Sequence, residues 1–467
     1  MAAQHTKASA ARRTPVLALL LAFATTVALS VPSAMAITFD TSDGTVNYPK
    51  KVNGTVTSCP TMDKAPEPYE VFLNTDDSEA RGWWDPKNNE PWSFASRIAQ
   101  LVCGAKQNAE IRLGMYFIRA IGTVSRPEAD PEVVFNALEW VKKNRNATIE
   151  LVLDDGLHKG STRDQITQRF AGIAKVRYCV NGCFNVNKSS VYVYAINHEK
   201  YLTISDTVWD KSDGPHPVVL STSGNFSRGQ IRNYWQEASL IYDDYKLWKE
   251  FDLRHDGMML CANPGCVNGG NAIKALQLKK ERKIWVDPFY RRYTDTGRGT
   301  SVSFSPQTPS APDYYIGQFD GIDCVVDKKV RIAMFKLTDS KALRMAESLA
   351  RLEKSGCDVE MLLSQSYGAL VLASSVKKVL SKAKIPYRCS AIPMHTKMIL
   401  IGPSTGNEGR VLVGTANMTT SGLRYSDEHV LTLDTRRANS QYQESMRRAY
   451  GMYLAGYDQL NQGSRSC

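Results

Sequence analysis

The sequence predicts an α/β protein with two pseudo-symmetric α/β sandwich halves. Apolar, strand-like segments alternate with amphipathic helical segments along the chain. The same series of segments occurs twice in the same order, and each series ends in a similar polar motif. Because strands that alternate with helices of about ten to fifteen residues form β-α-β units, we expect a mostly parallel sheet covered by helices in each half.

The N-terminus has the pattern of a secretory signal peptide. Its features are three basic residues, an apolar run and a small-residue cleavage site: Lys7, Arg12, Arg13, residues 16–31 and residues 34–36. We therefore expect a signal peptide at residues 1–36, cleaved near Ala36/Ile37, and a secreted, extracellular mature chain. No later segment approaches eighteen uninterrupted apolar residues, so we expect no membrane span.

Cysteine content and charge fit an exported protein with anionic partners. All ten cysteines follow the expected leader, and an even number in an exported chain favours disulfides. The pairs Cys179/Cys183 and Cys261/Cys266 are close enough to close short loops, while the pairing of the others stays open. The net charge of +11 becomes +8 without the three basic residues of the leader. This charge suits nucleic acid and anionic lipid alike.

The repeated elements match one another in order. Strand 70–73 corresponds to 301–305, and helical segments leading through Cys103 and Cys324 are followed by the apolar strands 111–116 and 330–335. Next come amphipathic helices with apolar residues at helical spacing, around 134–141 and 343–349, and then the strands 148–153 and 358–363. A second helix follows in each half, and then the matching segments 176–179 and 386–389. We place the halves at residues 37–290 and 291–467.

Each series ends in a His-x-Lys motif next to an apolar strand. The motifs are His198-Glu199-Lys200 and His395-Thr396-Lys397. Residues two apart on a strand point to the same face, so each histidine is expected to project into a pocket together with its lysine. A second strand in each half then leads to Ser223 and Asn225, or to Thr415 and Asn417, and a third element brings Glu237 or Glu428. His216 and His255 have no companion motif, and His429 lies next to Glu428; we interpret all three as structural or surface residues.

Two copies of His-x-Lys, Ser/Thr-x-Asn and Glu in this order resemble the phospholipase D superfamily, especially its secreted bacterial members. The resemblance covers nearly the whole mature chain and implies a phospholipase D-like duplication with one active site shared between the halves. One departure concerns the aspartate that follows the family's motif after four further residues. At these positions the sequence has Ser205 and Gly402.

These residue types suit the cleavage of a phosphodiester. The reaction needs a nucleophile, a proton donor for the leaving oxygen, and positive charge around the phosphoryl oxygens. One neutral imidazole can attack phosphorus, while a second, protonated imidazole serves the leaving group. The lysines supply point charges, and the asparagines, Ser223 and Thr415 supply hydrogen-bond donors. We expect Glu237 and Glu428 each to accept from the histidine of the opposite half, and neither a metal nor another cofactor is required.

The resemblance implies that His198 is the nucleophile and that His395 is the general acid and then the general base. The reversed assignment stays open because the two motifs are alike. The favoured function is a secreted phospholipase D-type phosphodiesterase that hydrolyses or transphosphatidylates phospholipids through a phosphohistidine. The alternatives are a secreted nuclease of the superfamily, acting on DNA or RNA, and an inactive protein that binds polyanions or lipid head groups. We expect a monomer without a stable protein partner, acting on a phospholipid membrane surface or another phosphodiester substrate.

Overall fold

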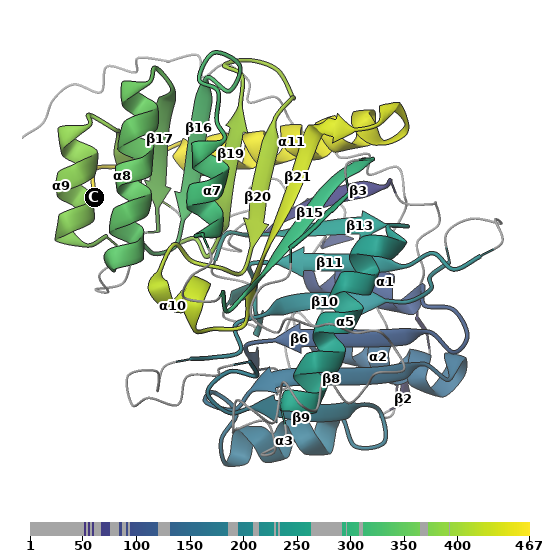
Figure 1. Ribbon diagram of the computed structural model, residues 1–467. Helices are drawn as coiled ribbons and strands as arrows, with labels where there is room; N and C mark the ends of the chain where they lie inside the picture. The colour runs from purple at the N-terminus through teal and green to yellow at the C-terminus, as the bar shows by residue number, and fades with distance from the viewer. Residues whose placement is uncertain are drawn as a thin grey trace, which may run out of the picture. The chain divides into compact units, whose positions relative to one another are not determined.

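The structure is a computed structural model of the chain (Figure 1). It separates residues 1–41 from a compact unit, residues 42–467, which contains both halves. The residues that it describes are these: 51–52, 55–56, 58–59, 67–74, 84–85, 90–91, 94–119, 131–184, 195–208, 214–227, 230–231, 234–262, 292–295, 297–307, 312–364, 372–391 and 393–467. The expected signal peptide, Cys266 and the boundary between residues 290 and 291 lie outside them, so these three remain predictions.

The first half is built on a seven-stranded sheet. Across the sheet its strands are β3 (Tyr69–Asn74), β13 (Gln236–Tyr242), β11 (Val218–Thr222), β10 (Lys200–Ile204), β6 (Glu110–Met115), β8 (Thr148–Asp154) and β9 (Lys175–Cys179). The strands β10, β11 and β13 are buried along their whole lengths. Both faces of the sheet are therefore covered at these strands.

The second half is built on an eight-stranded sheet. Across the sheet its strands are β14 (Arg292–Asp295), β15 (Arg298–Ser305), β21 (Glu428–Ala438), β20 (Arg410–Gly414), β19 (Lys397–Gly402), β16 (Lys329–Met334), β17 (Asp358–Leu363) and β18 (Tyr387–Cys389). From β15 to β18 these strands repeat the order of the first sheet, with β14 added at one edge. The predicted α/β fold with two similar halves is therefore confirmed.

The expectation of mostly parallel sheets is wrong. Only β6, β8 and β9 run parallel in the first sheet, and β16, β17 and β18 in the second. The strands β10, β11, β13 and β3, and their counterparts, pair antiparallel. The physical reason is the connections: a helix joins each parallel pair, whereas among the described residues no crossover helix lies between β10 and β13.

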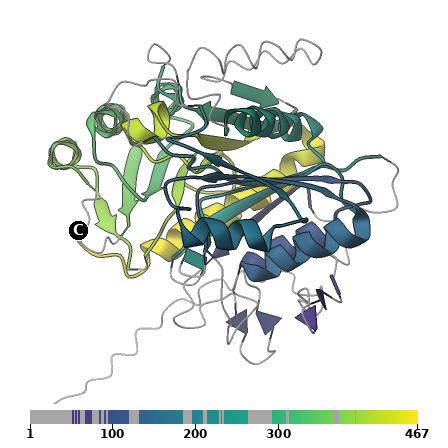
Figure 2. The ribbon, with the colours of Figure 1, turned by 90° about the horizontal axis from the view of Figure 1, so that it is seen from below.

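Helices cover both faces of each sheet. The helices are α1 (Phe94–Cys103), α2 (Glu132–Arg145), α3 (Ser161–Arg169), α5 (Tyr245–Cys261), α7 (Tyr314–Asp320), α8 (Ser340–Lys354), α9 (Ser374–Lys382), α10 (Thr420–Arg424) and α11 (Ser440–Asn461). Short strand pairs complete the described elements: β1 (Lys51–Val52) with β2 (Thr55–Val56), β4 (Trp84–Asp85) with β5 (Glu90–Pro91), and β7 (Ile118–Arg119) with β12 (Phe226–Ser227). In Figure 2, α5 lies on one face of the first sheet, and α2 and α3 lie on the other.

One apolar core is common to the two halves. It contains Leu73 and Trp235 from the first half together with Leu431 and Tyr453 from the second. Helix α11 follows the second sheet but packs on β3 of the first, and a Cβ atom at Gly456 would lie 2.8 Å from Leu73 and 2.9 Å from Trp235. The halves are therefore joined by a close-packed interface.

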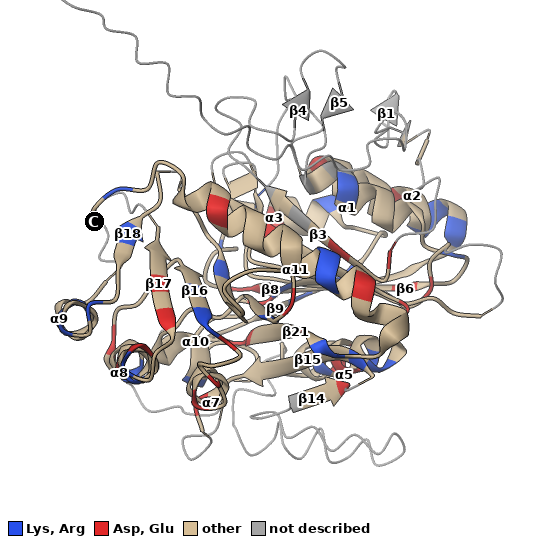
Figure 3. Cartoon of the chain, turned by 90° about the horizontal axis from the view of Figure 1, so that it is seen from above, with Lys and Arg blue, Asp and Glu red and all other residues tan. Residues whose placement is uncertain are grey.

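Four disulfides join described cysteines: Cys59–Cys103, Cys179–Cys183, Cys324–Cys357 and Cys389–Cys467. The expected local pair Cys179/Cys183 is among them. Among the described residues, no helix is long and apolar enough to cross a membrane. Lysines and arginines are spread over α1, α2, α8 and α11 in Figure 3.

Replacing Gly456 by valine is expected to destabilise the fold by about 1–3 kcal/mol, because the added methyl groups enter the contact with Leu73 and Trp235. The matched control is Gly317→Ala in α7, where a Cβ atom meets nothing within 4 Å. This change should stabilise the protein by about 0.5–1 kcal/mol, since alanine favours the helix. Urea denaturation of both variants measures the difference. Equal shifts in the two variants would contradict close packing at Gly456.

Candidate active site

Reciprocal backbone pairing brings the two motifs together. His198 lies just before β10, and its backbone N–H donates to Asp427 O at 2.9 Å, next to the start of β21 in the other half. His395 lies just before β19, and its N–H donates to Trp235 O at 2.9 Å, next to the start of β13. Each histidine is thus held beside the strand that carries the glutamate of the opposite half.

The two imidazoles face one site. Their ring centroids are 6.3 Å apart, and His198 and His395 are 6% and 7% exposed. Reacting atoms approach to about 3–3.5 Å before a bond forms. Two rings at this separation are therefore placed to act on opposite sides of a single phosphoryl group.

The lysines occupy equivalent positions in the two halves. Lys200 Nζ donates to His198 O at 2.7 Å, and Lys397 Nζ donates to His395 O at 2.6 Å. Each ammonium also lies over an aromatic ring, at 5.2 Å from the centre of Tyr116 and 5.3 Å from that of Phe335. Both lysines are fully buried, and burial favours their neutral forms. It lowers the pKa of Lys397 to about 7, against the opposing effect of Glu237 and Glu428.

The carboxylates differ between the halves. Glu428 Oε2 lies 2.8 Å from His198 Nδ1, across the boundary between the halves, as the sequence led us to expect. The corresponding expectation for Glu237 is wrong: His395 Nδ1 lies 2.8 Å from the backbone oxygen of Ser223. Ser223 connects Glu237 with His395. Its hydroxyl donates to Glu237 Oε2 at 2.9 Å, and its backbone oxygen contacts the His395 imidazole.

Of the polar residues after β11 and β20, Ser223 contacts His395 and Thr415 lies beside His198 and Glu428, whereas the expected site role of Asn225 and Asn417 remains a prediction. Asn225 Nδ2 donates to Gln230 at 2.8 Å, whereas Asn225 Oδ1 and Asn417 Oδ1 are buried without a hydrogen-bond partner in the described part of the chain. The Thr415 hydroxyl accepts from the backbone N–H of His429 at 2.9 Å. The hydroxyls of Ser223 and Thr415 are thus engaged within the protein, and their expected contact with a substrate remains a prediction.

Burial favours the neutral form of both imidazoles. It lowers the pKa of His198 and of His395 well below the usual value, and the charges of Lys200 and Lys397 lower both further. Burial also raises the pKa of Glu428 well above its usual value, against the attraction of Lys200. An anionic phosphodiester between the rings would offset the lysine charges and favour protonation of one imidazole.

Sequence reasoning missed a buried polar network beneath His198. Glu199 Oε2 lies 2.5 Å from His429 Nδ1, and His429 Nε2 lies 2.7 Å from Ser221 Oγ. Arg254 of α5 pairs with Glu199 at 3.1 Å. Long-range pairing of this kind leaves no local signal. Tyr116 and Phe335, by contrast, were detectable, because each ends the strand-like segment that repeats in the two halves.

The structure explains the two departures from the family pattern. The Ser205 hydroxyl accepts from Glu110 N at 2.8 Å and so ties the end of β10 to β6. At Gly402 a Cβ atom would lie 2.5 Å from the Tyr450 hydroxyl and 2.6 Å from Glu408 O. An aspartate has no room at Gly402, and after β10 the Ser205 hydroxyl makes its own contact with β6.

Anion affinity at the site is expected to fall as pH rises through neutrality. Below about pH 7 the Lys397 amine is protonated, and above it the amine is neutral before an anion binds, so the anion must bind together with a proton. Tungstate stays dianionic over this range. Calorimetry should therefore give several-fold weaker tungstate binding at about pH 8.5 than at about pH 6.5. Lys397→Met should bind weakly with a flatter pH dependence, and an unchanged wild-type affinity would contradict the lowered pKa.

Comparison with known proteins connects the geometry with a family. Residues 326–450 match the family described as cardiolipin synthase, PLD-like domain. No curated protein matches the chain. Among solved structures, phosphatidylserine synthase from Haemophilus influenzae Rd KW20 has a TM-score of 0.54 at 11% identity, covering 85% of this chain and 91% of that one.

Two further solved structures have TM-scores below 0.5. Yeast tyrosyl-DNA phosphodiesterase has a TM-score of 0.47 at 11% identity, over 80% of this chain and 91% of that one. Polyphosphate kinase from Porphyromonas gingivalis has a TM-score of 0.45 at 12% identity. The match covers 82% of this chain but only 50% of the kinase. The family match in the second half, the repeat of the same motif in the first and the shared fold lead to one conclusion: residues 326–450 are similar to a PLD-like domain, and the chain as a whole has a phospholipase D-like, phosphodiesterase-type fold.

Proposed function

We propose that this chain is a secreted phospholipase D-type phosphodiesterase that hydrolyses or transphosphatidylates phospholipids through a phosphohistidine. The observation that carries the proposal is the convergence of two His-Lys pairs from opposite halves, with imidazoles 6.3 Å apart. One shared site with two imidazoles suits a double displacement at phosphorus, because one ring can attack while the other serves the leaving group.

The first step forms a bond between His198 Nε2 and phosphorus and breaks the bond from phosphorus to the leaving alcohol. Glu428 contacts Nδ1 at 2.8 Å, which leaves Nε2 as the attacking atom. His395 gives its proton to the departing oxygen. It then takes a proton from water or an alcohol, whose oxygen attacks phosphorus and releases His198. Lys200 and Lys397 offset the charge that gathers on the phosphoryl oxygens.

The carboxylate partner supports His198 rather than His395 as the nucleophile. Attack on phosphorus leaves a positive charge on the imidazole, and a carboxylate at Nδ1 stabilises that charge more than a neutral carbonyl does. His198 has Glu428 at this position, whereas His395 has the backbone oxygen of Ser223.

The fold neighbour and the predicted export favour a phospholipid substrate over nucleic acid. The solved structure with the TM-score of 0.54 is a phosphatidylserine synthase by its printed name. A secreted enzyme meets lipid surfaces outside the cell, and a positive net charge favours anionic ones.

The substrate class can be tested with two substrates in parallel. The purified chain is incubated with phosphatidylcholine vesicles plus ethanol, and separately with plasmid DNA, both in excess chelator. Phosphatidylethanol formed in chelator is the expected result and requires no metal. DNA nicking without lipid turnover would replace the lipid substrate by nucleic acid, and silence in both assays would favour a binding protein.

His198→Ala and His395→Ala are each expected to lower turnover by at least about 10³-fold, because one shared site needs both imidazoles. His216→Ala, distant from the site, is the matched control and should retain activity. Retention of about half the activity in either site variant would mean two independent sites. That outcome would contradict the shared architecture.

The identity of the nucleophile is tested by trapping the phosphoenzyme. After brief reaction and quenching at alkaline pH, peptide mass spectrometry should find the phosphoryl group on the peptide that contains His198. The label should accumulate in His395→Asn, since release of the intermediate needs a general base. A label only on the His395 peptide of the unaltered enzyme would reverse the assignment.

A further inference from the structure

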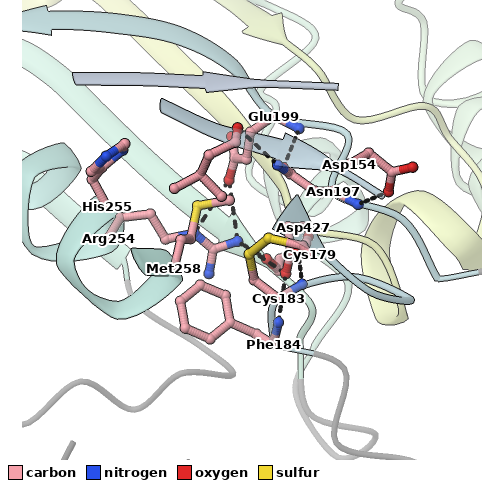
Figure 4. Close-up of a disulfide and its surroundings, with 12 residues drawn as sticks. Asp154, Cys179, Cys183, Phe184, Asn197, Glu199, Arg254, His255, Met258 and Asp427 are labelled. Atoms are coloured by element: carbon pink, nitrogen blue, oxygen red, sulfur yellow. Dashed lines mark hydrogen bonds and ion pairs between the residues drawn. A yellow bond between two sulfur atoms is a disulfide. The ribbon is translucent and has the colours of Figure 1, made fainter. Parts of the chain in front are cut away.

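A disulfide ring lies directly beneath the His198 side of the site. Cys179 ends β9, and its disulfide with Cys183 spans four positions of sequence. The backbone N–H groups of Cys183 and Phe184 both donate to the carboxylate of Asp427, the second at 3.1 Å. The two sulfur atoms and a carboxylate oxygen of Asp427 lie within 4.8 Å of one another. Figure 4 shows Asp427 beside the disulfide, with Phe184 and Arg254 close to it.

Asp427 connects this ring to the reacting groups through the backbone. Its carbonyl accepts from the N–H of His198, and its own N–H donates to Ile196 O, both at 2.9 Å. The next residue along the chain is Glu428, whose carboxylate contacts the His198 imidazole at 2.8 Å. The position of Asp427 therefore determines where both His198 and its carboxylate partner lie.

Further contacts hold the same segment from the other side. Arg254 Nη2 lies 3.8 Å from Asp427 Oδ1 and 3.1 Å from Glu199 Oε1. Asn197, which precedes His198, donates from its backbone N–H to Asp154 at 2.9 Å. Figure 4 shows Asp154, Asn197, Glu199 and Arg254 around the disulfide and Asp427.

The other half has no equivalent arrangement among its described residues. The residue before Glu237 is Gln236, and its side-chain amide donates to the backbone of Gln230 at 3.3 Å. Cys389, the counterpart of Cys179 in the repeat, is bonded to the distant Cys467. The ring therefore supports only the histidine whose imidazole contacts a glutamate.

A wholly buried carboxylate is costly unless donors surround it. Asp427 is 0% exposed and is surrounded by two N–H groups and the Arg254 guanidinium. Burial raises the pKa of Asp427 to about 7. These donors fix the position of Asp427, because its carboxylate would lose them if the start of β21 moved away from the segment that follows β9.

We propose that Asp427, clamped by the Cys179–Cys183 ring, is a positioning residue that holds Glu428 against His198 and so prepares this imidazole for attack. Asp427 acts through its neighbours and does not touch the phosphoryl group. The proposal rests on the proposed function, because it assigns a role in forming the phosphoenzyme.

The kinetic test uses Asp427→Asn and the double variant Cys179→Ser/Cys183→Ser. Both should lower kcat by about 10–100-fold with KM within about twofold, since misplacement by about 1 Å affects the chemical step rather than binding. The matched control is Cys324→Ser/Cys357→Ser, which removes a disulfide distant from the histidines and should leave kcat unchanged. Equal loss in the two double variants, or an unchanged kcat in the first, would overturn the proposal.

The second measurement needs no substrate. In a chain with ¹⁵N-labelled histidine, long-range proton–nitrogen NMR reports each imidazole, and His198→Gln and His395→Gln assign the two signals. Asp427→Asn and the serine double variant should shift the His198 signal and leave that of His395 in place. Unmoved signals, or equal movement of both, would overturn the proposal. Absence of any turnover in the unaltered chain would contradict the proposed function instead, while the NMR comparison still decides whether Asp427 positions His198.

Discussion

The site depends on a reciprocal backbone contact between the two halves. His198 N–H donates to Asp427 O, and His395 N–H donates to Trp235 O, each at 2.9 Å. Each contact joins the segment before one half's lysine-bearing strand to the start of the other half's glutamate-bearing strand. The centroids of two imidazoles from separate sheets thereby lie 6.3 Å apart, and a displacement of either half would separate the rings.

Apolar packing in the core that the two halves share stabilises the backbone contact between them and offsets the cost of burying the two lysines. Lys200 and Lys397 have no exposed surface, and burial lowers the pKa of each. Unfavourable burial of this kind is typical of sites prepared for an oppositely charged ligand. Helix α11 packs on both halves and keeps them fixed relative to each other. Its apolar contacts with Leu73 and Trp235 do not change with the protonation of the histidines and lysines.

The duplicated architecture is not symmetric where the chemistry takes place. One imidazole contacts Glu428, and the other contacts a backbone oxygen. Beneath the first lies a buried network with Glu199, His429 and Arg254, whereas the second motif has Thr396 at the position of Glu199. Two similar motifs can hold opposite protonation states only if their surroundings differ, and here the difference lies in residues outside the motifs.

The sequence by itself determined the duplication, the order of strands and helices and the set of motif residues, because periodicity and spacing are local properties of the chain. It also identified the pair Cys179/Cys183 by its separation. The direction of the strands next to β10, the contact of Ser223 with His395 and the burial of Asp427 were decided only by the tertiary structure. The last two features arise where segments more than a hundred residues apart meet, as His198 and Glu428 also do, and the partner at such a contact leaves no mark on either segment. The direction of the strands next to β10 depends on the connections between strands, which the pattern of apolar residues does not specify.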